Sequence, residues 1–368
     1  MQKYKVATVQ FEPNQFNKET NPIIKEDLKS IITEKLSWDK FKNKVILITG
    51  GNGFLASYII KSLLSANIYY KLNLKIICLV RNKTSKLNRL KSIKKSKSLT
   101  IFYHNLDRPL PKDLPNSDFI IHSASQASPK YYHTDPVGTL LPNSIGTFYL
   151  LEYAVKCKSE KFLFFSSGEV YGVPLDKNKK IKEDNYGYLD SLNLRSCYAE
   201  SKRIGETMCV AYSKQFNLNV NIVRPFHTYG PGLNLDDGRV FADFVADVVS
   251  KSKIIIKGNG LEKRCFCYLS DATVGFLRIL LNGADREAYN LGNPSCEISI
   301  KNLAKLISNL FPHRNIKIKF ERPSINKNYL KSPVVKVLPS IEKIKKLGWF
   351  PKTSLKEGFK KTINSFIL

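Results

Sequence analysis

The chain has 368 residues, of which 43% are hydrophobic, and this suits two compact units or one large α/β domain with an elaboration. Lys and Arg number 59 against 31 Asp and Glu, a formal net charge of +28 that fits nucleic acid or an anionic small substrate. The lysines are scattered along the chain, so we expect a solvated basic surface and no nucleic-acid partner.

Membrane, export and metal signals are weak in this sequence. No apolar run approaches a membrane span and the N-terminus lacks a signal-peptide core, so we predict a cytoplasmic protein with no membrane partner. The seven cysteines show no paired spacing, and Cys265 and Cys267 stand too close together for a zinc knuckle. We therefore expect free thiols in a reducing compartment and no metal site.

Residues 1–42 are predicted to form an N-terminal helical extension. Asn21-Pro22 breaks the preceding chain, and apolar side chains then recur at helical spacing. This stripe comprises Ile23, Leu28, Ile31, Ile32, Lys35 and Leu36. We expect Trp38 and Phe41 to pin the helix to the body of the protein. The mixture of acidic and basic residues argues against a targeting peptide.

A glycine turn follows the first predicted strand, residues 44–49. Gly50 and Gly53 open the segment G-x-x-G-x-x-A, which ends at Ala56 and runs into an apolar helix. Glycines let the backbone approach a pyrophosphate, and the helix N-terminus supplies free N–H groups and a positive dipole end. The strand, turn and helix together predict a dinucleotide site.

Arg81 follows the second predicted strand, residues 75–80. An acid at this point selects a free ribose 2′-hydroxyl and an arginine accommodates a 2′-phosphate. Arg81 therefore favours NADP, or it is a loop cation that stacks on adenine without reading a phosphate. We therefore predict that the cofactor is NAD, with NADP as the alternative.

Strands and helices continue to alternate through residue 165. Further strands are predicted at residues 99–103, 119–125 and 162–165, with a helix after Asn143. The pattern predicts a Rossmann-type, doubly wound parallel sheet with its ligand at the carboxyl ends of the strands. His122 is expected to be a hydrogen-bonded core histidine.

Tyr198 and Lys202 stand four residues apart in RSCYAESKR, so on a helix they share one face. An ammonium group beside a phenol favours the phenolate, which can take a proton from an alcohol while a nicotinamide takes the hydride. A lone Tyr-x-x-x-Lys pair is more often a surface pair. Here a strand ending in Ser166 and Ser167 precedes it, and a strand-end hydroxyl can bind the same substrate oxygen.

These motifs resemble the extended short-chain dehydrogenase/reductase superfamily, in particular its NAD-dependent sugar-nucleotide epimerases and dehydratases. The resemblance continues through RPFHTYGPG, KRCFCYLSD, YNLGNP and LGWFP, and so runs from about Lys44 to the end of the chain. It implies an NAD(P)-binding Rossmann domain over 43–224 and a smaller α/β substrate domain over 225–368, partly interleaved with the first. It also implies a homodimer formed by the helices after Asn143 and around Tyr198.

The resemblance implies three sets of site residues. The catalytic residues are Ser167, Glu169, Tyr198 and Lys202. The cofactor-binding residues are Gly50, Gly53, Phe54, Leu55, Arg81, Asn105, Leu106, Ala124, Ser125, Tyr198, Lys202 and Pro225. The residues that bind the nucleotide-diphosphate sugar are Asn143, Arg195, His227, Arg239, Val240 and Arg264. Two departures stand out: Arg81 replaces the usual acid, and His227 replaces the family's asparagine.

The residues after the strand-end hydroxyl bear on the reaction. Many 4,6-dehydratases carry Asp-Glu there, but this chain has Gly168-Glu169. The segments GEVYG, RSCY and DGRV resemble UDP-glucuronate decarboxylases. We therefore expect decarboxylation of a UDP-hexuronate through a 4-keto intermediate, of the UDP-glucuronate to UDP-xylose type. The alternatives are a 4,6-dehydratase or 4-epimerase acting on a neutral hexose nucleotide, and a degenerate fold serving as a basic binding module.

Overall fold

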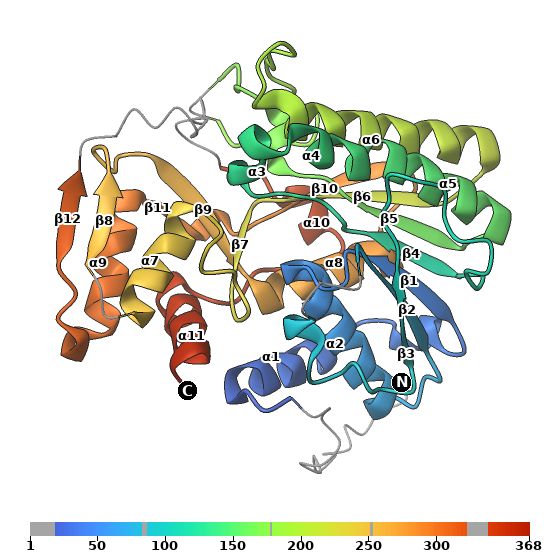
Figure 1. Ribbon diagram of the computed structural model, residues 1–368, viewed down its shortest axis with the longest axis horizontal. Coiled ribbons are helices and arrows are strands. Elements are labelled where there is room, and N and C mark those ends of the chain that lie inside the picture. The colour runs from blue at the N-terminus through green and yellow to red at the C-terminus, as the bar shows by residue number, and fades with distance from the viewer. Residues whose placement is uncertain (1–18, 83–86, 177–178, 251–252, 322–337) are drawn as a thin grey trace, which may run out of the picture.

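A seven-stranded parallel sheet forms the centre of the computed structural model, which describes residues 19–82, 87–176, 179–250, 253–321 and 338–368 (Figure 1). The strand order is β10-β6-β5-β4-β1-β2-β3, and every neighbouring pair is parallel. The strands are β1 (Val45–Thr49), β2 (Lys75–Val80), β3 (Leu99–Tyr103), β4 (Phe119–His122), β5 (Lys161–Phe165), β6 (Val220–Pro225) and β10 (Glu287–Leu291). The predicted Rossmann-type sheet is confirmed.

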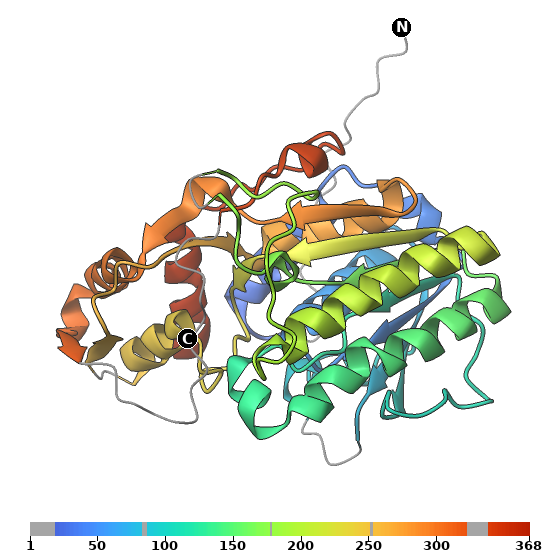
Figure 2. The same ribbon diagram turned by 90° about the horizontal axis from the view of Figure 1, so that it is seen from above.

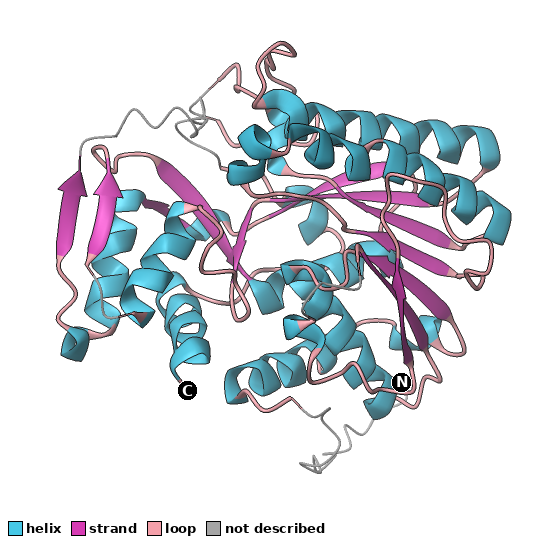
Figure 3. Ribbon diagram, in the orientation of Figure 1, coloured by secondary structure: helices cyan, strands magenta, loops and turns pink. Residues whose placement is uncertain are grey.

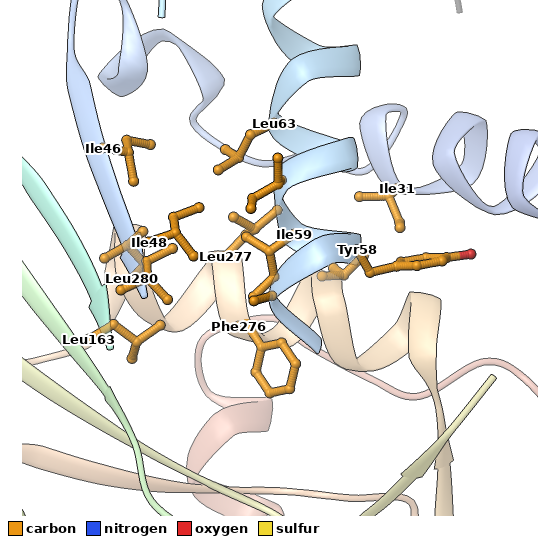
Figure 4. Packing of buried hydrophobic residues seen from close by; sticks show 14 of the residues in the cluster. Ile31, Ile46, Ile48, Tyr58, Ile59, Leu63, Leu163, Phe276, Leu277 and Leu280 are labelled. Carbon is orange, nitrogen blue, oxygen red and sulfur yellow. The ribbon is translucent and has the colours of Figure 1, made fainter. Parts of the chain in front are cut away.

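Helices cover both faces of this sheet. On one face lie α2 (Phe54–Tyr69) and α8 (Leu269–Asn282), and on the other lie α4 (Pro136–Asn143), α5 (Ile145–Cys157) and α6 (Ser196–Phe216). Alternate side chains of β1 serve the two cores: Ile46 and Ile48 pack toward α2 and α8, whereas Leu47 packs toward α5. Because both faces are buried there, the central strands β1, β4 and β5 are almost continuous apolar runs. Figure 4 shows Ile46 and Ile48 meeting residues of the two helices.

A smaller unit flanks the carboxyl ends of the large sheet (Figure 3). Its strands are β7 (His227–Tyr229), β9 (Lys263–Tyr268) and β11 (Glu297–Ser299) in one sheet, and β8 (Ile254–Lys257) and β12 (Ile318–Glu321) in another. Its helices are α7 (Val240–Val249), α9 (Ile300–Leu310) and α11 (Leu355–Ile367). Between them the chain returns to the large sheet through α8 and β10. The domain boundaries at residues 42 and 224 stay a prediction.

Short helices complete the described chain. They are α3 (Pro129–Thr134), α10 (Glu342–Lys345) and the 3₁₀ helices η2 (Trp38–Phe41), η3 (Asn88–Leu90), η4 (Gly168–Tyr171), η5 (Pro294–Cys296) and η6 (Pro312–Arg314). None of the helices in the described ranges combines the length and the apolar character that crossing a membrane requires.

The N-terminal helix α1 (Pro22–Ile32) packs against both units. Asn21 caps it by accepting hydrogen bonds from the N–H groups of Ile23 and Ile24. The helix ends at Ile32, so the predicted stripe residues Lys35 and Leu36 lie beyond it. Trp38 and Phe41 are buried, as predicted.

Asp27 of α1 is a buried junction between the two units. Its carboxylate accepts hydrogen bonds from the hydroxyls of Tyr58 on α2 and Tyr268 on β9, each at 2.7 Å, and the ammonium of Lys361 on α11 lies 3.4 Å away. The side chain of Asp27 is 1% exposed. The extension therefore contacts the helix of the glycine turn, the second unit's sheet and the C-terminal helix through one carboxylate.

Candidate active site

A cavity of about 880 Å³ opens at the carboxyl ends of β1, β4, β5 and β6, between the sheet and the smaller unit. Most residues that the sequence predicted for the site line it. They are Gly50, Gly53, Phe54, Leu55, Arg81, Ser125, Ser167, Glu169, Arg195, Tyr198, Lys202, Pro225, His227, Arg239, Val240 and Arg264. The cavity brings together side chains from positions more than 200 residues apart, as a parallel sheet permits at a single edge.

The glycine turn forms a close-packed cradle at one end of the cavity. Gly50 has a φ of +66°, and a Cβ there would lie 2.7 Å from the Cα of Ala124, so no larger residue fits. Gly53 precedes α2 and offers no side-chain cap to the helix, which leaves the first N–H groups available to an anion. This arrangement fits a dinucleotide pyrophosphate.

Ser125 and Arg81 are two further cavity residues that fit a dinucleotide. The Ser125 hydroxyl is buried and has no hydrogen-bond partner among the described residues, so it is available to a ligand. Arg81 is exposed at the rim, where its guanidinium donates to the side-chain oxygen of Gln126 at 3.2 Å. This position of Arg81 is compatible both with a contact to a ribose 2′-phosphate and with stacking on adenine.

Four predicted site residues do not line the cavity. Ala124 lies behind Gly50, and the side chain of Asn105 donates to Asp107 at 2.7 Å. Leu106 is buried in the core beside α5. Asn143 is fully buried and donates to the carbonyl of Thr139 and to the hydroxyl of Ser201.

Asn143 does not reach the cavity wall in the ligand-free structure, and its substrate-binding role stays a prediction. Its amide joins the end of α4 to α6, the helix that carries Tyr198. His122 is buried, and its ring bonds to the hydroxyls of Thr49 and Thr147 at 2.8 and 3.1 Å. The prediction that His122 is a core histidine is confirmed.

Tyr198 and Lys202 face the cavity from α6, opposite the strand-end Ser167. Lys202 donates to the carbonyl of Phe165 at 2.6 Å, and its Nζ lies 5.8 Å from the centroid of the Tyr198 ring. Burial raises the pKa of Tyr198 to about 12, against the opposing effect of the Ser167 hydroxyl. Burial also lowers the pKa of Lys202 to about 7, although Glu206 favours its charged form.

The ligand-free cavity therefore holds a protonated phenol. Burial is the largest cause of both shifts, so no shift of the Tyr198 pKa toward the phenolate is seen in the ligand-free cavity. The activating role of Lys202 stays a prediction.

A buried ion pair fixes α6 against the sheet. Arg224, at the end of β6, donates to both carboxylate oxygens of Glu206 at 2.8 and 2.6 Å, and it is 1% exposed. The hydroxyl of Ser166 donates to the same carboxylate, and both Ser166 and Ser167 line the cavity. Arg224 also donates to the Tyr171 hydroxyl at 2.8 Å.

The segment after Ser167 presents Glu169 to the cavity. Arg195 donates from Nη2 to the Glu169 carboxylate at 3.2 Å, and its guanidinium lies 5.5 Å from the centroid of the Tyr132 ring. Tyr132 stacks on Tyr198, with 5.3 Å between ring centroids and 15° between planes. A Cβ at Gly168 would lie 3.1 Å from the Phe226 ring, which disfavours any side chain at that position.

Cationic side chains gather where the smaller unit meets the cavity. Arg239 pairs with Asp237, and Arg264 lies on β9 at the same wall. His227 occupies β7, and its Nδ1 is buried with no hydrogen-bond partner in the described part of the chain. Burial, with the charges of Arg264 and Arg239, lowers the pKa of His227 to about 3, so the ring is neutral at physiological pH.

Arg89, Tyr132 and Gln126 are among the cavity residues that the sequence did not identify. Arg89 donates to the carbonyls of Gly232 and Asn52 and so joins the glycine turn to the smaller unit. Tyr132 and Gln126 follow the small-residue exit of β4. The aromatic pair Tyr131-Tyr132 beside that exit was the one available signal. In the described ranges no group of three or more His, Cys, Asp or Glu side chains is placed to hold a metal ion.

Comparison with known proteins identifies clear relatives. The sequence profile of the NAD dependent epimerase/dehydratase family matches residues 46–292. UDP-glucuronic acid decarboxylase 5 of Arabidopsis thaliana is 34% identical over 318 residues, which cover 86% of this chain and 87% of that protein. UDP-glucuronic acid decarboxylase 1 of Xenopus tropicalis is 33% identical over 346 residues, covering 93% and 77%.

Solved structures agree in fold. UDP-glucose 4-epimerase from Thermotoga maritima, with UDP-glucose, has a TM-score of 0.72 at 24% identity and covers 88% of this chain and 98% of its own. UDP-glucuronic acid 4-epimerase from Bacillus cereus, in complex with UDP-glucuronic acid and NAD, has a TM-score of 0.75 at 22% identity, covering 88% and 99%. At these identities the likeness supports the fold alone.

The buried Lys202 predicts a pH dependence of stability in the ligand-free protein. Its pKa is about 7 in the folded protein, against an ordinary value of 10.5, so between these values the unfolded chain binds a proton that the folded protein does not. The free energy of unfolding should therefore rise with pH from about 7, by at most ~1.4 kcal/mol per pH unit from this group. Lys202→Met should remove this rise.

Urea unfolding at pH 6.5 to 9 measures the effect, and Lys91→Met, at an exposed lysine, is the control. An identical pH dependence in the wild-type protein and Lys202→Met would show that Lys202 is not held near neutrality.

Proposed function

Because the chain belongs to the NAD dependent epimerase/dehydratase family, we propose that it decarboxylates a UDP-hexuronate through a 4-keto intermediate, of the UDP-glucuronate to UDP-xylose type. The curated relatives at 33–34% identity are named UDP-glucuronic acid decarboxylases. The observation that carries the choice of reaction is Gly168-Glu169 at the end of β5. It offers one carboxylate to the cavity and has no side chain at position 168, where many dehydratases carry an additional acid.

The dinucleotide is NAD, for which Gly50, Gly53 and Ser125 provide the cradle and the free hydroxyl described above. When bound, NAD supplies the hydride acceptor for carbon 4 of the sugar and returns the hydride later. Tyr198 then has the position of the general base that takes the 4-hydroxyl proton. The hydroxyl of Ser167, close enough to Tyr198 to lower the pKa of its phenol, would bind the same substrate oxygen by a hydrogen bond.

Oxidation at carbon 4 places the carboxylate of a hexuronate β to a carbonyl. Such an acid loses CO₂ with formation of an enolate, and the hydroxyls of Tyr198 and Ser167 stabilise the charge on its oxygen. The product then needs a proton at carbon 5, which Glu169 or a water molecule that it holds delivers. CO₂ leaves as a neutral molecule, so no acid is needed at position 168.

The charged residues of the smaller unit serve the nucleotide diphosphate in this proposal. Arg264 carries forked donors suited to phosphate oxygens. Arg264 and Arg239 both lie close enough to His227 to disfavour its charged form, and the unpartnered Nδ1 of the neutral ring is available to the substrate. In all, six cationic and three acidic side chains line the cavity, which suits a substrate with a diphosphate and a carboxylate.

The chief rival is dehydration or 4-epimerisation of a neutral hexose nucleotide, which uses the same Ser167, Tyr198 and Lys202. A basic binding module without activity is disfavoured, because the glycine cradle and these three residues converge on one cavity.

We also propose that two copies pair through α5 and α6, which run side by side on one face (Figure 2). Ile145 and Phe148 on α5 and Ile204 and Val210 on α6 are 39–42% exposed, an unusual set of apolar side chains for a free helical surface.

All seven cysteines are unpaired, which supports a reducing, cytoplasmic compartment. Fractionation of the source cells tests that assignment.

Incubation with a panel of sugar nucleotides tests the reaction. We expect UDP-glucuronate to lose 44 Da, the mass of CO₂, while UDP-glucose is left unchanged. Glu169→Gln should slow CO₂ release or reprotonation by roughly 10²–10⁴-fold and still bind NAD, because only a proton-transfer group is removed. Mass spectrometry of the nucleotides and NAD titration measure both effects. Conversion of a neutral hexose nucleotide, with UDP-glucuronate untouched, would refute the decarboxylase.

Tyr198→Phe tests the proton-transfer step. The ring and its stacking on Tyr132 are retained and only the hydroxyl is lost, so the fold should persist. Turnover should fall by roughly 10²–10⁴-fold, the range typical of general acid–base catalysis. Single-turnover formation of bound NADH, read at its absorbance, measures the step directly. Near-normal NADH formation would exclude Tyr198 as the base.

Light scattering tests the dimer. The wild-type protein should have twice the mass of one chain, and Phe148→Glu should give monomers because it places a charge in the apolar contact. Val137→Glu, at an exposed apolar residue outside α5 and α6, is the control and should leave the dimer intact. A wild-type monomer at micromolar concentration contradicts the proposal.

A further inference from the structure

Glu169 and Arg195 form an ion pair on the cavity wall. Nη2 of Arg195 lies 3.2 Å from a carboxylate oxygen of Glu169, and the two side chains are 12% and 43% exposed respectively. Both residues line the cavity. In the ligand-free protein, the carboxylate proposed to act at carbon 5 is thus already engaged.

The guanidinium of Arg195 is only partly satisfied. Its Nη1 is buried and has no hydrogen-bond partner among the described residues. Leaving a buried donor unpaired is costly, more so on a charged group, and such atoms in a native structure call for an explanation. An anionic ligand in the cavity that accepts a hydrogen bond from Nη1 provides one.

Aromatic contacts place this guanidinium near the reacting phenol. Tyr132, 2% exposed, contacts Arg195 through one cation–π interaction and Tyr198 through ring stacking. The backbone N–H of Arg195 also donates to the side-chain oxygen of Asn193 at 3.0 Å, which fixes the residue just before α6. Arg195 therefore belongs to the same rigid group as Tyr198.

We propose that Arg195 determines specificity for a charged sugar, and that the carboxylate of a hexuronate displaces Glu169 from it. The inference rests on the proposed function. The substrate carboxylate accepts from Nη1 and competes for Nη2, so Glu169 turns toward the sugar only when a carboxylate is present. A neutral hexose nucleotide has no group that competes for Arg195, and Glu169 stays paired.

The ion pair between Glu169 and Arg195 forms again after the reaction. The bond between carbons 5 and 6 breaks, its electron pair passes into the enolate of the 4-keto sugar, and a proton is added at carbon 5. CO₂ carries no charge, so it does not form an ion pair with Arg195. The guanidinium then pairs with Glu169 again and ceases to retain the product through this group.

Binding to proteins that also carry Tyr198→Phe, which blocks turnover, tests the inference. Calorimetry on the NAD-loaded protein compares UDP-glucuronate with UDP-glucose; the shared UDP cancels contributions from the diphosphate. Arg195→Gln should weaken UDP-glucuronate by about tenfold or more, the effect of losing a hydrogen bond to a charged group, and leave UDP-glucose within about twofold. Glu169→Gln should strengthen UDP-glucuronate, because it removes the competing carboxylate.

The opposite signs distinguish this role from a structural one. If the ion pair only held the wall together, both variants would weaken both nucleotides alike, and that result overturns the inference. Arg195→Lys, which keeps the charge, should retain part of the preference for UDP-glucuronate. Arg286→Gln, at an exposed arginine paired with Asp285 outside the cavity, controls for net charge and should change neither affinity.

Failure of the inference is separable from failure of the proposed function. CO₂ release from UDP-glucuronate by the wild-type protein, with an unchanged binding preference in Arg195→Gln, would refute the role of Arg195 alone. Absence of CO₂ release would refute the decarboxylase whichever residue selects the nucleotide.

Discussion

The ion pair between Arg224 and Glu206 is the constraint on which the site depends. A guanidinium that is 1% exposed must keep its carboxylate, because removing one partner leaves an uncompensated buried charge. The pair therefore fixes the end of β6 against α6, and Ser166 adds the end of β5 to the same carboxylate. With these three elements in fixed positions, the next residue, Ser167, lies beside Tyr198 of the first turn of α6 on the cavity wall.

The charged side chains of the cavity come from several elements, and Tyr198 and Lys202 are only two of its ionisable groups. Burial keeps the phenol of Tyr198 protonated and weakens the charge on Lys202, so the spacing of these two residues does not by itself produce a reactive base. The arginines from the smaller unit and from the segment before α6 contribute the remaining field. Both units therefore contribute charged side chains to the cavity.

The sequence predicted the sheet, and it placed most of its candidate site residues on the wall of one cavity, because those signals are local. An apolar run followed by glycines, or a tyrosine four residues before a lysine, keeps its meaning whatever surrounds it. Asn105, Leu106 and Asn143 lie outside that wall, because a motif gives a position along the chain and not the direction of a side chain, and the roles of all these residues stay predictions. Arg89 was missed because its partners, Asn52 and Gly232, lie far from it in sequence.

The junction at Asp27 changes how the two halves of the enzyme are to be understood. A cut at residue 42, where the sequence places a domain boundary, would separate from the body a carboxylate that two buried tyrosine hydroxyls require. It would also uncover the apolar surfaces of α2 and α8 that α1 shields. The extension is therefore neither a tail nor a separate domain. Helix α1 is a third component of the interface between the units, so changes within Pro22–Ile32 act on the contact between them.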